Sequence, residues 1–370
     1  MTTPDTSMLP QPKPKKVSLY DHTRESLEIL LDGEPGYRID QLWKGLYEQF
    51  QDPADISNLP KSLRSKLAAI PTALRTVTES VSDNGDTIKW LWELLDGTRV
   101  ETVLMHYKDR STVCISSQAG CAMDCSFCAT GQAGFDRQLT TGEIVEQVIR
   151  AARRSAPTRV SNIVFMGMGE PMANYDRTWE AIDRLHNDFG ISARHITVST
   201  VGIIPGINRM ADEDLPVNLA VSLHAANDVL RDQLVPINKR YPLDDLVDAC
   251  VDYFNKKGRR ISFEWALINE VNDRPSDAYD LARIARECRA HINLIPLNPT
   301  PGYLVMGSPN SRVNDFVREL EHYGANVTVR RTRGTEIDAA CGQLRAGHEV
   351  ASPGTAVQVA APIRRTKTPQ

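Results

Sequence analysis

The sequence lacks any long apolar run and any excess of basic residues. None of its stretches approaches the roughly 20 consecutive apolar residues that cross a bilayer, so no membrane span is predicted. The start, MTTPDTSMLPQPKPKK, has no apolar core of the kind found in secretory signals. The 43 Lys and Arg are outnumbered by 47 Asp and Glu, although proteins that bind nucleic acid usually carry a basic excess. We therefore expect a cytoplasmic protein, and its net charge alone gives no support for a nucleic-acid partner.

Cysteine is scarce, with seven in 370 residues, yet Cys121, Cys125 and Cys128 lie together in GCAMDCSFCATG. Cytoplasmic thiols stay reduced, so clustered cysteines there more often bind metal or take part in chemistry than form structural disulfides. Three thiolates on one loop can hold three irons of a [4Fe–4S] cluster and leave the fourth iron open, whereas ferredoxin-type clusters use four cysteines. The alternative is a structural zinc site with Cys114 as fourth ligand.

The chain divides into regions of different pattern. Its first residues are rich in Pro, Thr and Lys and are predicted to be disordered. YRIDQLWKGLYEQF places its apolar residues on one helical face, and Asp96-Gly97 between two β-forming runs predicts a hairpin. We predict a disordered tail over 1–18, a helical accessory domain over 19–80, a linking β-hairpin over 81–107, a barrel domain over 108–345 and a C-terminal tail over 346–370.

Strand-like and helical runs alternate from about Thr112 onward. The six strand-like runs are STVCISS, SNIVFMGM, RHITVSTVG, PVNLAVSLHA, RISFEWALI and AHINLIPLNP. This alternation predicts an α/β fold with a parallel sheet. Since no dinucleotide-binding fingerprint is present, we expect a partial (β/α)6 barrel, with its functional site at the C-terminal ends of the strands.

Several motifs together resemble a known family. The C-x3-C-x2-C spacing after the first barrel strand resembles the signature of the radical S-adenosylmethionine (SAM) superfamily, and FMGMGEP follows the second strand. VETVLM, VSLHAANDVLRDQLVPINK, INLIPLNP and RRTRGTEIDAACGQL narrow the resemblance to the RlmN family of RNA adenine-C2 methyltransferases. The resemblance extends from about Tyr37 to Leu344 and implies a radical SAM barrel with a helical RNA-binding accessory domain.

The resemblance also implies cofactors and their ligands. One [4Fe–4S] cluster per chain would be held by Cys121, Cys125 and Cys128, with SAM on the open iron and two SAM molecules used in each turnover. The residues implied in SAM binding follow the strands of the barrel: Gly169, Glu170, Ser199, Ser222, Leu223, His224 and Asn298.

Three further residues acquire catalytic roles from the resemblance. Cys341 would carry the methyl group on its sulfur and form a covalent protein–RNA intermediate through C2 of the adenine. Cys114 would remove the C2 proton and form a transient disulfide with Cys341 on product release, and Glu101 would be a proton acceptor near the adenine. Cys250 and Cys288 lie outside any motif, and we expect them in the core.

The implied partners are RNA and a reductant. By resemblance the substrates are 23S rRNA and the adenine beside the anticodon in a subset of tRNAs, and the electron donor is a flavodoxin or ferredoxin system. The adenine must be flipped or single-stranded to reach a buried cluster. The patches 256–260 and 330–333 are plausible phosphate contacts, and we expect a monomer without membrane partners.

Three alternatives stay open on the sequence. A related adenine-C8 methyltransferase of 23S rRNA, from an antibiotic-resistance branch, shares the cluster and both reactive cysteines, and Pro171 after GMGE favours C2. A radical SAM enzyme acting on a protein or small molecule would not need Cys341 within DAACGQL. A non-catalytic zinc or iron–sulfur RNA-binding protein would leave Gly167, Gly169 and Glu170 without a purpose.

Overall fold

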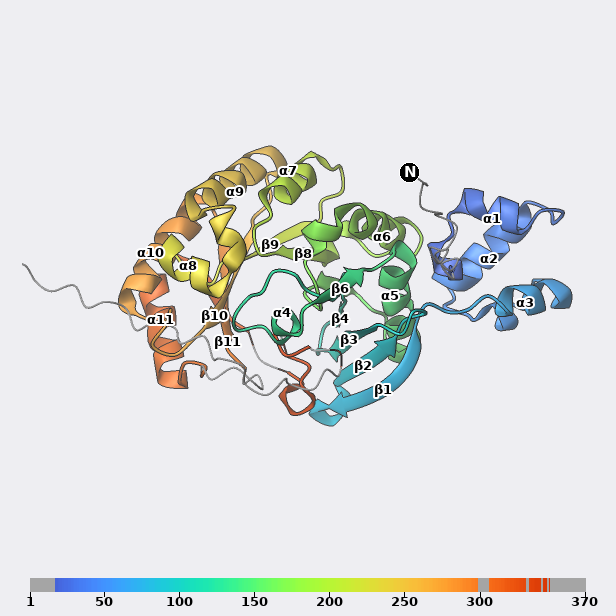
Figure 1. Ribbon diagram of the computed structural model, residues 1–370, viewed down its shortest axis with the longest axis horizontal. Coiled ribbons are helices and arrows are strands. Elements are labelled where there is room, and N and C mark those ends of the chain that lie inside the picture. Colours follow the sequence, from blue (N-terminus) through green and yellow to red (C-terminus); the bar gives the residue numbers. More distant parts are fainter. Residues whose placement is uncertain (1–16, 299–305, 331–332, 341, 345, 347–370) are drawn as a thin grey trace, which may run out of the picture.

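The computed structural model describes residues 17–298, 306–330, 333–340, 342–344 and 346, and its centre is a mixed sheet of ten strands. The strands follow the order β1-β2-β3-β4-β7-β8-β9-β10-β11-β12. Helices α6, α7, α9, α10 and α11 form the outer rim, while the short helix α4 lies near the middle of the molecule (Figure 1). None of the helices described is both long enough and apolar enough to span a membrane.

Seven neighbouring strands of this sheet run parallel. They are β4 (Ser111–Cys114), β7 (Asn162–Phe165), β8 (Ile196–Thr200), β9 (Asn218–Ser222), β10 (Ser262–Leu267), β11 (His291–Pro296) and β12 (Asn326–Val329). The first six coincide with the six strand-like runs of the sequence, so the predicted α/β fold with its parallel sheet is confirmed.

Helices connect these strands, as βαβ units require. They are α5 (Thr141–Ser155), α6 (Tyr175–Asn187), α7 (Ile204–Asp212), α8 (Asp228–Leu234), α9 (Leu243–Lys257), α10 (Pro275–Glu287) and α11 (Asn310–His322). Helix α5 begins at a capping box, in which the Thr140 hydroxyl accepts from the Glu143 amide and the Glu143 carboxylate accepts from the Thr140 amide. Ile144 and Val148 of α5 are fully buried, so the helix is fixed against the sheet.

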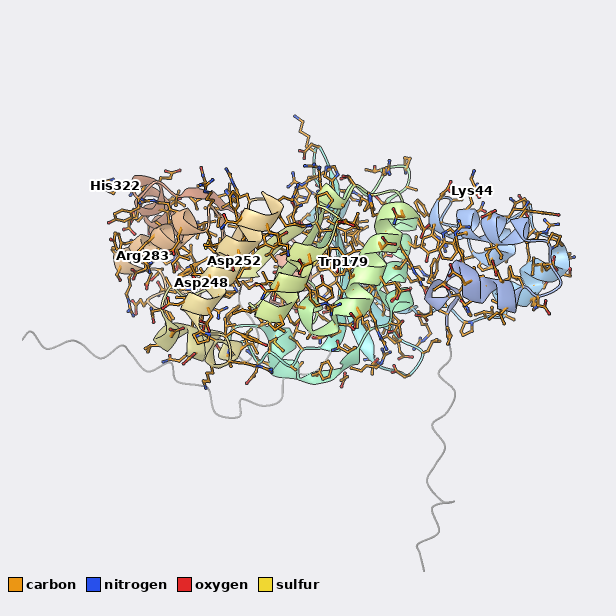
Figure 2. All side chains as sticks on the ribbon, turned by 90° about the horizontal axis from the view of Figure 1, so that it is seen from above. Lys44, Trp179, Asp248, Asp252, Arg283 and His322 are labelled. Atoms are coloured by element: carbon orange, nitrogen blue, oxygen red, sulfur yellow. The ribbon has the colours of Figure 1, made fainter. Side chains whose placement is uncertain are left out.

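Three helices precede the sheet: α1 (Arg24–Leu30), α2 (Tyr37–Tyr47) and α3 (Lys61–Ala68). Two arginines join this region to the barrel helices. Arg184 donates to the carbonyl oxygens of Tyr20 and His22, and Nη1 of Arg153 donates to both carboxylate oxygens of Asp52. Seen from above, the N-terminal helices with Lys44 lie at one end of the molecule, and Arg283 and His322 lie at the other (Figure 2).

An antiparallel ribbon links the helical region to the barrel. It consists of β1 (Arg75–Ser82), β2 (Thr87–Glu93) and β3 (Arg99–His106), and β3 also pairs antiparallel with β4. The β2–β3 hairpin confirms the turn predicted at Asp96-Gly97, where Gly97 has φ +89°. Strand β1 differs from the sequence-based prediction, which extended the helical region to residue 80. Its side chains are mostly exposed, so pairing with β2 rather than an apolar pattern defines the strand.

A second, two-stranded sheet frames the cysteine loop. Strand β5 (Gln118–Gly120) pairs antiparallel with β6 (Phe135–Gln138), and the loop between them contains Cys121 and α4 (Ala129–Ala133). This insertion places the three cysteines at the C-terminal end of β4, where a barrel carries its functional site. Short 3-10 turns complete the fold at Leu19–Asp21, Pro53–Asp55, Asp83–Gly85, Pro171–Asn174, Ala193–His195, Pro236–Lys239 and Thr335–Ile337.

Candidate active site

The cysteine loop is folded tightly around its own backbone. The Cys121 amide donates to the Gly134 carbonyl at 2.7 Å, and the Cys128 amide donates to the Cys125 carbonyl at 3.1 Å. Cys128 is the N-cap of α4, and Cys125 is buried in an apolar cluster with Phe127 and neighbouring aliphatic side chains. The loop therefore presents three thiols from a fixed backbone.

The three thiols are chemically suited to a cationic cluster. Burial raises the pKa of Cys121 to about 12; a backbone hydrogen bond at Met123 opposes the shift, and the nearby Cys128 adds to it. Burial and the same neighbour raise the pKa of Cys125 well above its usual value. Buried thiols that repel one another lose their protons when a metal cluster supplies the compensating charge. The residues thus fit an iron–sulfur cluster held by three cysteines.

A cavity adjoins the cysteine loop and collects most of the residues implied in SAM binding. This cysteine-loop cavity is lined by Cys125, Cys128, Gly169, Glu170, Ser199, Ser222 and His224, among others. They come from the loop and from the ends of β7, β8 and β9, as a barrel site requires. Ser199 and Ser222 lie side by side, with their hydroxyl oxygens 3.4 Å apart.

Two residues implied in SAM binding lie elsewhere. Asn298 lines a neighbouring cavity together with Cys114. The Leu223 side chain is fully buried in the core, and its backbone amide donates to the Glu264 carbonyl. Leu223 can therefore face a cofactor only through its backbone.

The glycines after β7 pack against the strand beside them. A side chain at Gly167 would come within 2.6 Å of the Ile115 carbonyl oxygen, and one at Gly169 would overlap the Gln118 side chain. Gly169 also has φ +95°, a conformation that favours glycine. These contacts mean that the glycines are needed for close packing. The sequence predicts a further role, in which they allow a ligand to approach the backbone closely.

Glu170 is buried at the edge of the cavity. One carboxylate oxygen accepts from the Met172 amide at 2.9 Å and the other accepts from the Val201 amide at 2.8 Å. Burial raises the pKa of Glu170 to about 7, although these two hydrogen bonds oppose the shift. The side chain thereby joins the ends of β7 and β8.

His224 is held as a neutral imidazole. Its Nδ1 accepts a hydrogen bond from the Ala266 amide at 2.9 Å, so the ring proton lies on Nε2. Burial and the nearby Arg231 lower the pKa of His224 to about 3. The ring packs edge-on against Phe127 of the cysteine loop, with 4.7 Å between ring centroids. His224 is thus a fixed hydrogen-bond donor within the cavity wall.

Arg231 is a buried residue that the sequence analysis did not select. Its guanidinium donates to the carbonyl oxygens of Val201 at 2.6 Å and Leu223 at 3.1 Å, and to the Asn238 side chain at 2.7 Å. It thereby ties the ends of β8 and β9 to α8. The surrounding VLRDQL contains no recognisable chemical motif. A role for Arg231 was indicated only by its position as a charged residue within a segment that resembles the family.

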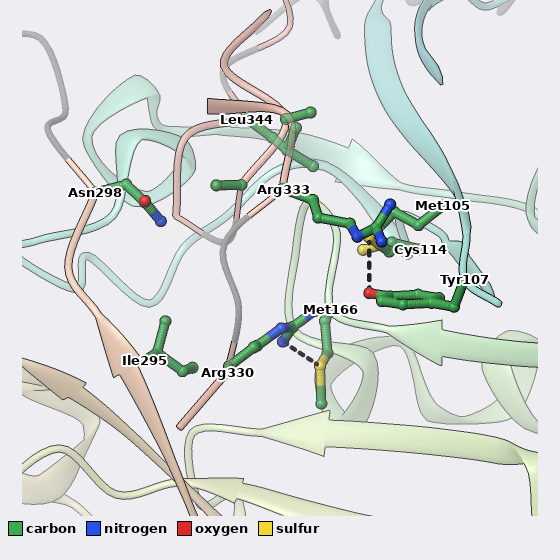
Figure 3. A pocket seen from close by; sticks show the side chains of 11 residues that line it. Met105, Tyr107, Cys114, Met166, Ile295, Asn298, Arg330, Arg333 and Leu344 are labelled. Atoms are coloured by element: carbon green, nitrogen blue, oxygen red, sulfur yellow. Dashed lines mark hydrogen bonds between the residues drawn. The ribbon is translucent and has the colours of Figure 1, made fainter. Parts of the chain in front are cut away.

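Cys114 and Glu101 lie on neighbouring strands at the ribbon side of the site. Cys114, the last residue of β4, is buried and lines a second cavity, the Cys114 cavity (Figure 3). Glu101 on β3 is buried, with its Oε1 3.0 Å from Lys89 Nζ, and its Oε2 accepts from the Ala346 amide at 3.3 Å.

Described neighbours of Cys341 line both cavities. Cys341 itself lies outside the described residues, so its predicted role and its disulfide with Cys114 stay predictions. Its neighbours are described: Ala339, Ala340 and Leu344 line the Cys114 cavity, and Gly342 and Leu344 line the cysteine-loop cavity.

The remaining cysteines give no disulfide or single-ion site. No disulfide joins any two of the six cysteines that the structure describes, and Cys250 and Cys288 are buried in the core. Within the described ranges, no three His, Cys, Asp or Glu side chains are grouped closely enough to hold one metal ion. Each thiolate of a cubane binds a different iron, so the ligands of a cluster are more widely spaced than those of zinc. A zinc site with Cys114 as a ligand would need its thiols grouped around one ion, and the described cysteines are not so grouped.

Comparisons with known proteins agree with this geometry. Residues 115–282 match the model of the radical SAM superfamily, whose members use a [4Fe–4S] cluster and SAM. A probable dual-specificity RNA methyltransferase RlmN of Chloroflexus aurantiacus is 51% identical over 351 residues, covering 90% of this chain and 93% of the relative. One of Salinispora tropica is 48% identical over 347 residues, with the same coverage of both chains.

A solved structure extends the agreement to the whole fold. The crystal structure of a radical SAM methyltransferase from Sphaerobacter thermophilus superposes with a TM-score of 0.86 at 49% identity. The superposition covers 89% of this chain and 99% of that one. From its motifs, its fold and these relatives, the chain belongs to the RlmN family of radical SAM methyltransferases.

Proposed function

We propose that this protein methylates C2 of a specific adenine in 23S rRNA and of the adenine beside the anticodon in a subset of tRNAs. The names of the relatives, which specify dual-specificity RNA methyltransferases, support an RNA substrate. The C2 position is supported by the motifs that this sequence shares with the family, including the cysteine segment DAACGQL.

The observation that carries the proposal is a pair of hydrogen bonds that hold the described neighbours of Cys341 against the cysteine loop. The Ala129 amide donates to the Gly342 carbonyl at 2.8 Å, and the Thr130 hydroxyl donates to the Leu344 carbonyl at 2.5 Å. Both donors belong to α4, which begins directly after Cys128. The residues that flank Cys341 thus contact the cysteine loop and also line the cavity that contains Cys114.

The cofactors would be bound by the residues of the cysteine-loop cavity. Cys121, Cys125 and Cys128 would hold one [4Fe–4S] cluster, and SAM would lie against Gly169, Glu170, Ser199, Ser222 and His224. The family resemblance also assigns Leu223 and Asn298 to SAM, Leu223 through its backbone and Asn298 from the neighbouring cavity. When bound, the cluster and two SAM molecules per turnover supply a methyl group and hydrogen abstraction by a carbon radical. Adenine C2 needs such chemistry, because it is an electron-poor carbon without an acidic proton.

The protein's own residues would carry the methyl carbon and move the proton. Cys341 takes a methyl group on its sulfur and passes that carbon to adenine C2, forming a covalent adduct. Cys114 removes the proton from C2 of that adduct, once the adduct radical has lost one electron, which would pass to the oxidised cluster. The Cys114 thiolate then attacks the Cys341 sulfur, so that an S–S bond forms as the bond from sulfur to the product carbon breaks, and the released carbon takes a proton to become the methyl group. The Glu101 carboxylate would be a further proton acceptor, and its contacts with Lys89 and the Ala346 amide support this role because they hold it beside the same segment. A flavodoxin or ferredoxin system would supply electrons to the monomeric enzyme.

The test uses the cluster-loaded protein, a chemical reductant, unmodified 23S RNA and SAM with a deuterated methyl group. Nucleosides from the digested RNA are identified by mass spectrometry beside authentic standards. We expect 2-methyladenosine carrying the label, and none from a Cys341→Ala variant that holds the same amount of iron. Label in 8-methyladenosine would assign the protein to the C8 branch. SAM cleavage without any methyladenosine would exclude the RNA substrate.

A further inference from the structure

Two arginine side chains from distant parts of the chain stack on one tyrosine ring. The guanidinium carbon of Arg110 lies 4.3 Å from the centroid of the Tyr107 ring, and that of Arg333 lies 4.6 Å from it. Arg110 belongs to the turn between β3 and β4, whereas Arg333 follows β12. Folding therefore brings two cations to a single aromatic residue.

This group, which we call the Tyr107 stack (Tyr107, Arg110 and Arg333), lies at the border of the Cys114 cavity. Tyr107 and Arg333 line that cavity together with Cys114 (Figure 3). Tyr107 and Arg110 also line a larger cavity at the N-terminal ends of the parallel strands, the basal cavity. The stack therefore lies where the basal cavity meets the Cys114 cavity.

The described residues that line the two cavities carry more positive than negative charge. Arg330 lines both cavities, and its Nη1 lies 3.6 Å from the Met166 sulfur. Of the described residues that line the two cavities, Glu264 alone carries a carboxylate. That carboxylate accepts hydrogen bonds from Ser262 and Asn293, so it is already engaged. An anion that entered either cavity would therefore contact arginine side chains. None of the described residues of the cavity walls presents an exposed carboxylate to it.

The stacked cations are only weakly compensated by the protein. Arg333 lies 3.3 Å from the exposed Asp86 carboxylate and donates to the His106 carbonyl, and Arg110 lies 3.3 Å from the exposed Asp109 carboxylate. Exposed ion pairs of this kind add about 1 kcal/mol at most. Stacking on an aromatic face holds each guanidinium in place while its N–H groups still point outward in the guanidinium plane. An oriented fork of this kind suits a phosphate, which has several acceptor oxygens.

We propose that Arg110 and Arg333, stacked on Tyr107, bind a backbone phosphate of the RNA strand beside the nucleotide that enters the Cys114 cavity. This inference rests on the proposed function, since it takes an RNA strand as the ligand. The contact positions the strand and does not read its sequence, because phosphate contacts carry no base information. Arg110 and Arg333 are therefore positioning residues.

The test measures how salt weakens RNA binding. A fluorescein-labelled stem-loop RNA with an adenine in its loop is titrated with cluster-loaded enzyme at several KCl concentrations. Each lost phosphate contact in a single-stranded loop lowers the slope of log affinity against log salt by roughly 0.7. We expect this decrease, a higher Kd and a higher KM with little change in kcat for Arg333→Gln and for Arg110→Gln. Arg333→Lys keeps the charge and should retain most of the slope.

Arg283→Gln is the matched control, because Arg283 is an exposed arginine on α10 at the outer end of the molecule (Figure 2). It should leave both slope and Kd unchanged. Iron content and melting temperature identify a variant that fails to fold. If Arg333→Gln fails to fold, Arg110→Gln still tests the proposal, because Arg110 lies on an exposed turn. Slopes equal to that of the wild type in both glutamine variants would overturn the phosphate site. If the variants show the expected slope changes but the wild-type enzyme methylates neither this RNA nor 23S RNA, the phosphate site would stand and the proposed function would be contradicted.

Discussion

The hydroxyl of Thr130 donates a hydrogen bond to the carbonyl oxygen of Leu344 at 2.5 Å, although 214 residues separate them in the chain. Both residues are buried. The contact fastens the segment that contains Cys341 to the helix that starts at the last of the three clustered cysteines. A methyl-carrying thiol must lie within reach of the cofactors, so this contact is expected to matter for catalysis more than for cluster assembly.

Thr130→Val removes that contact with little change in side-chain volume. The Leu344 carbonyl then loses a buried partner, which costs about 1 to 3 kcal/mol. We expect the rate of methyl transfer to RNA to fall by roughly tenfold, which corresponds to a cost within this range. Iron content and absorbance at about 400 nm should stay at wild-type values. Thr130→Ser keeps the hydroxyl and should restore most of the activity. Equal loss in the serine and valine variants would show that the hydrogen bond is not responsible.

Cys128→Ala tests the assignment of the cluster ligands. With two thiols left on the loop, a [4Fe–4S] cluster lacks a third protein ligand, so we expect loss of iron, of the brown colour and of SAM cleavage. Cys288→Ala removes a buried thiol far from the loop motif and should keep all three. A Cys128→Ala protein that remains brown and cleaves SAM would remove Cys128 from the ligand set.

Arg231→Met tests whether the buried guanidinium holds the cavity together. The carbonyls of Val201 and Leu223 would lose their donor, and we expect about 3 kcal/mol of destabilisation. SAM binding should also weaken, because these carbonyls belong to the ends of the strands that carry Ser199 and Ser222. Thermal unfolding and SAM titration measure the two effects, with the exposed Arg240→Gln as control. Unchanged melting and SAM affinity in the methionine variant would contradict this role.

Much of the fold followed from local patterns. Each of the six apolar runs after residue 110, like the Asp96-Gly97 turn, can be recognised from a few adjacent residues. Strands β4 to β11 of the main sheet and the hairpin were therefore predictable. Strand β1 was not, because its residues are mostly exposed and only pairing with β2 makes them a strand. Pairing partners are not visible in the pattern of a single segment.

The site was predictable where its chemistry depends on one short motif. The three clustered cysteines and Glu170 lie in such motifs, and the structure brings Cys125, Cys128 and Glu170 to one cavity. Arg231, Tyr107 and Arg110 were missed because their roles arise from contacts made only after folding, whereas Arg333 lies in the basic patch 330–333 that the sequence indicated. Arg333 meets Tyr107 across more than half of the sequence, and no spacing rule connects the two.

Cys114→Ala tests the last step of the proposed reaction. Cys114 lines the same cavity as Ala340 and Leu344, which are described neighbours of Cys341. In the proposed reaction its thiol takes the C2 proton from an adduct on Cys341. Without that thiol the covalent protein–RNA adduct cannot resolve, and we expect it to accumulate in place of 2-methyladenosine. A gel shift that RNase reverses detects the adduct. The double variant Cys114→Ala and Cys341→Ala is the control and should give no shift, because the carbon has no sulfur to attach to. If Cys114→Ala turned over at the wild-type rate, Glu101 or another base would take the proton and Cys114 would have no part in the reaction.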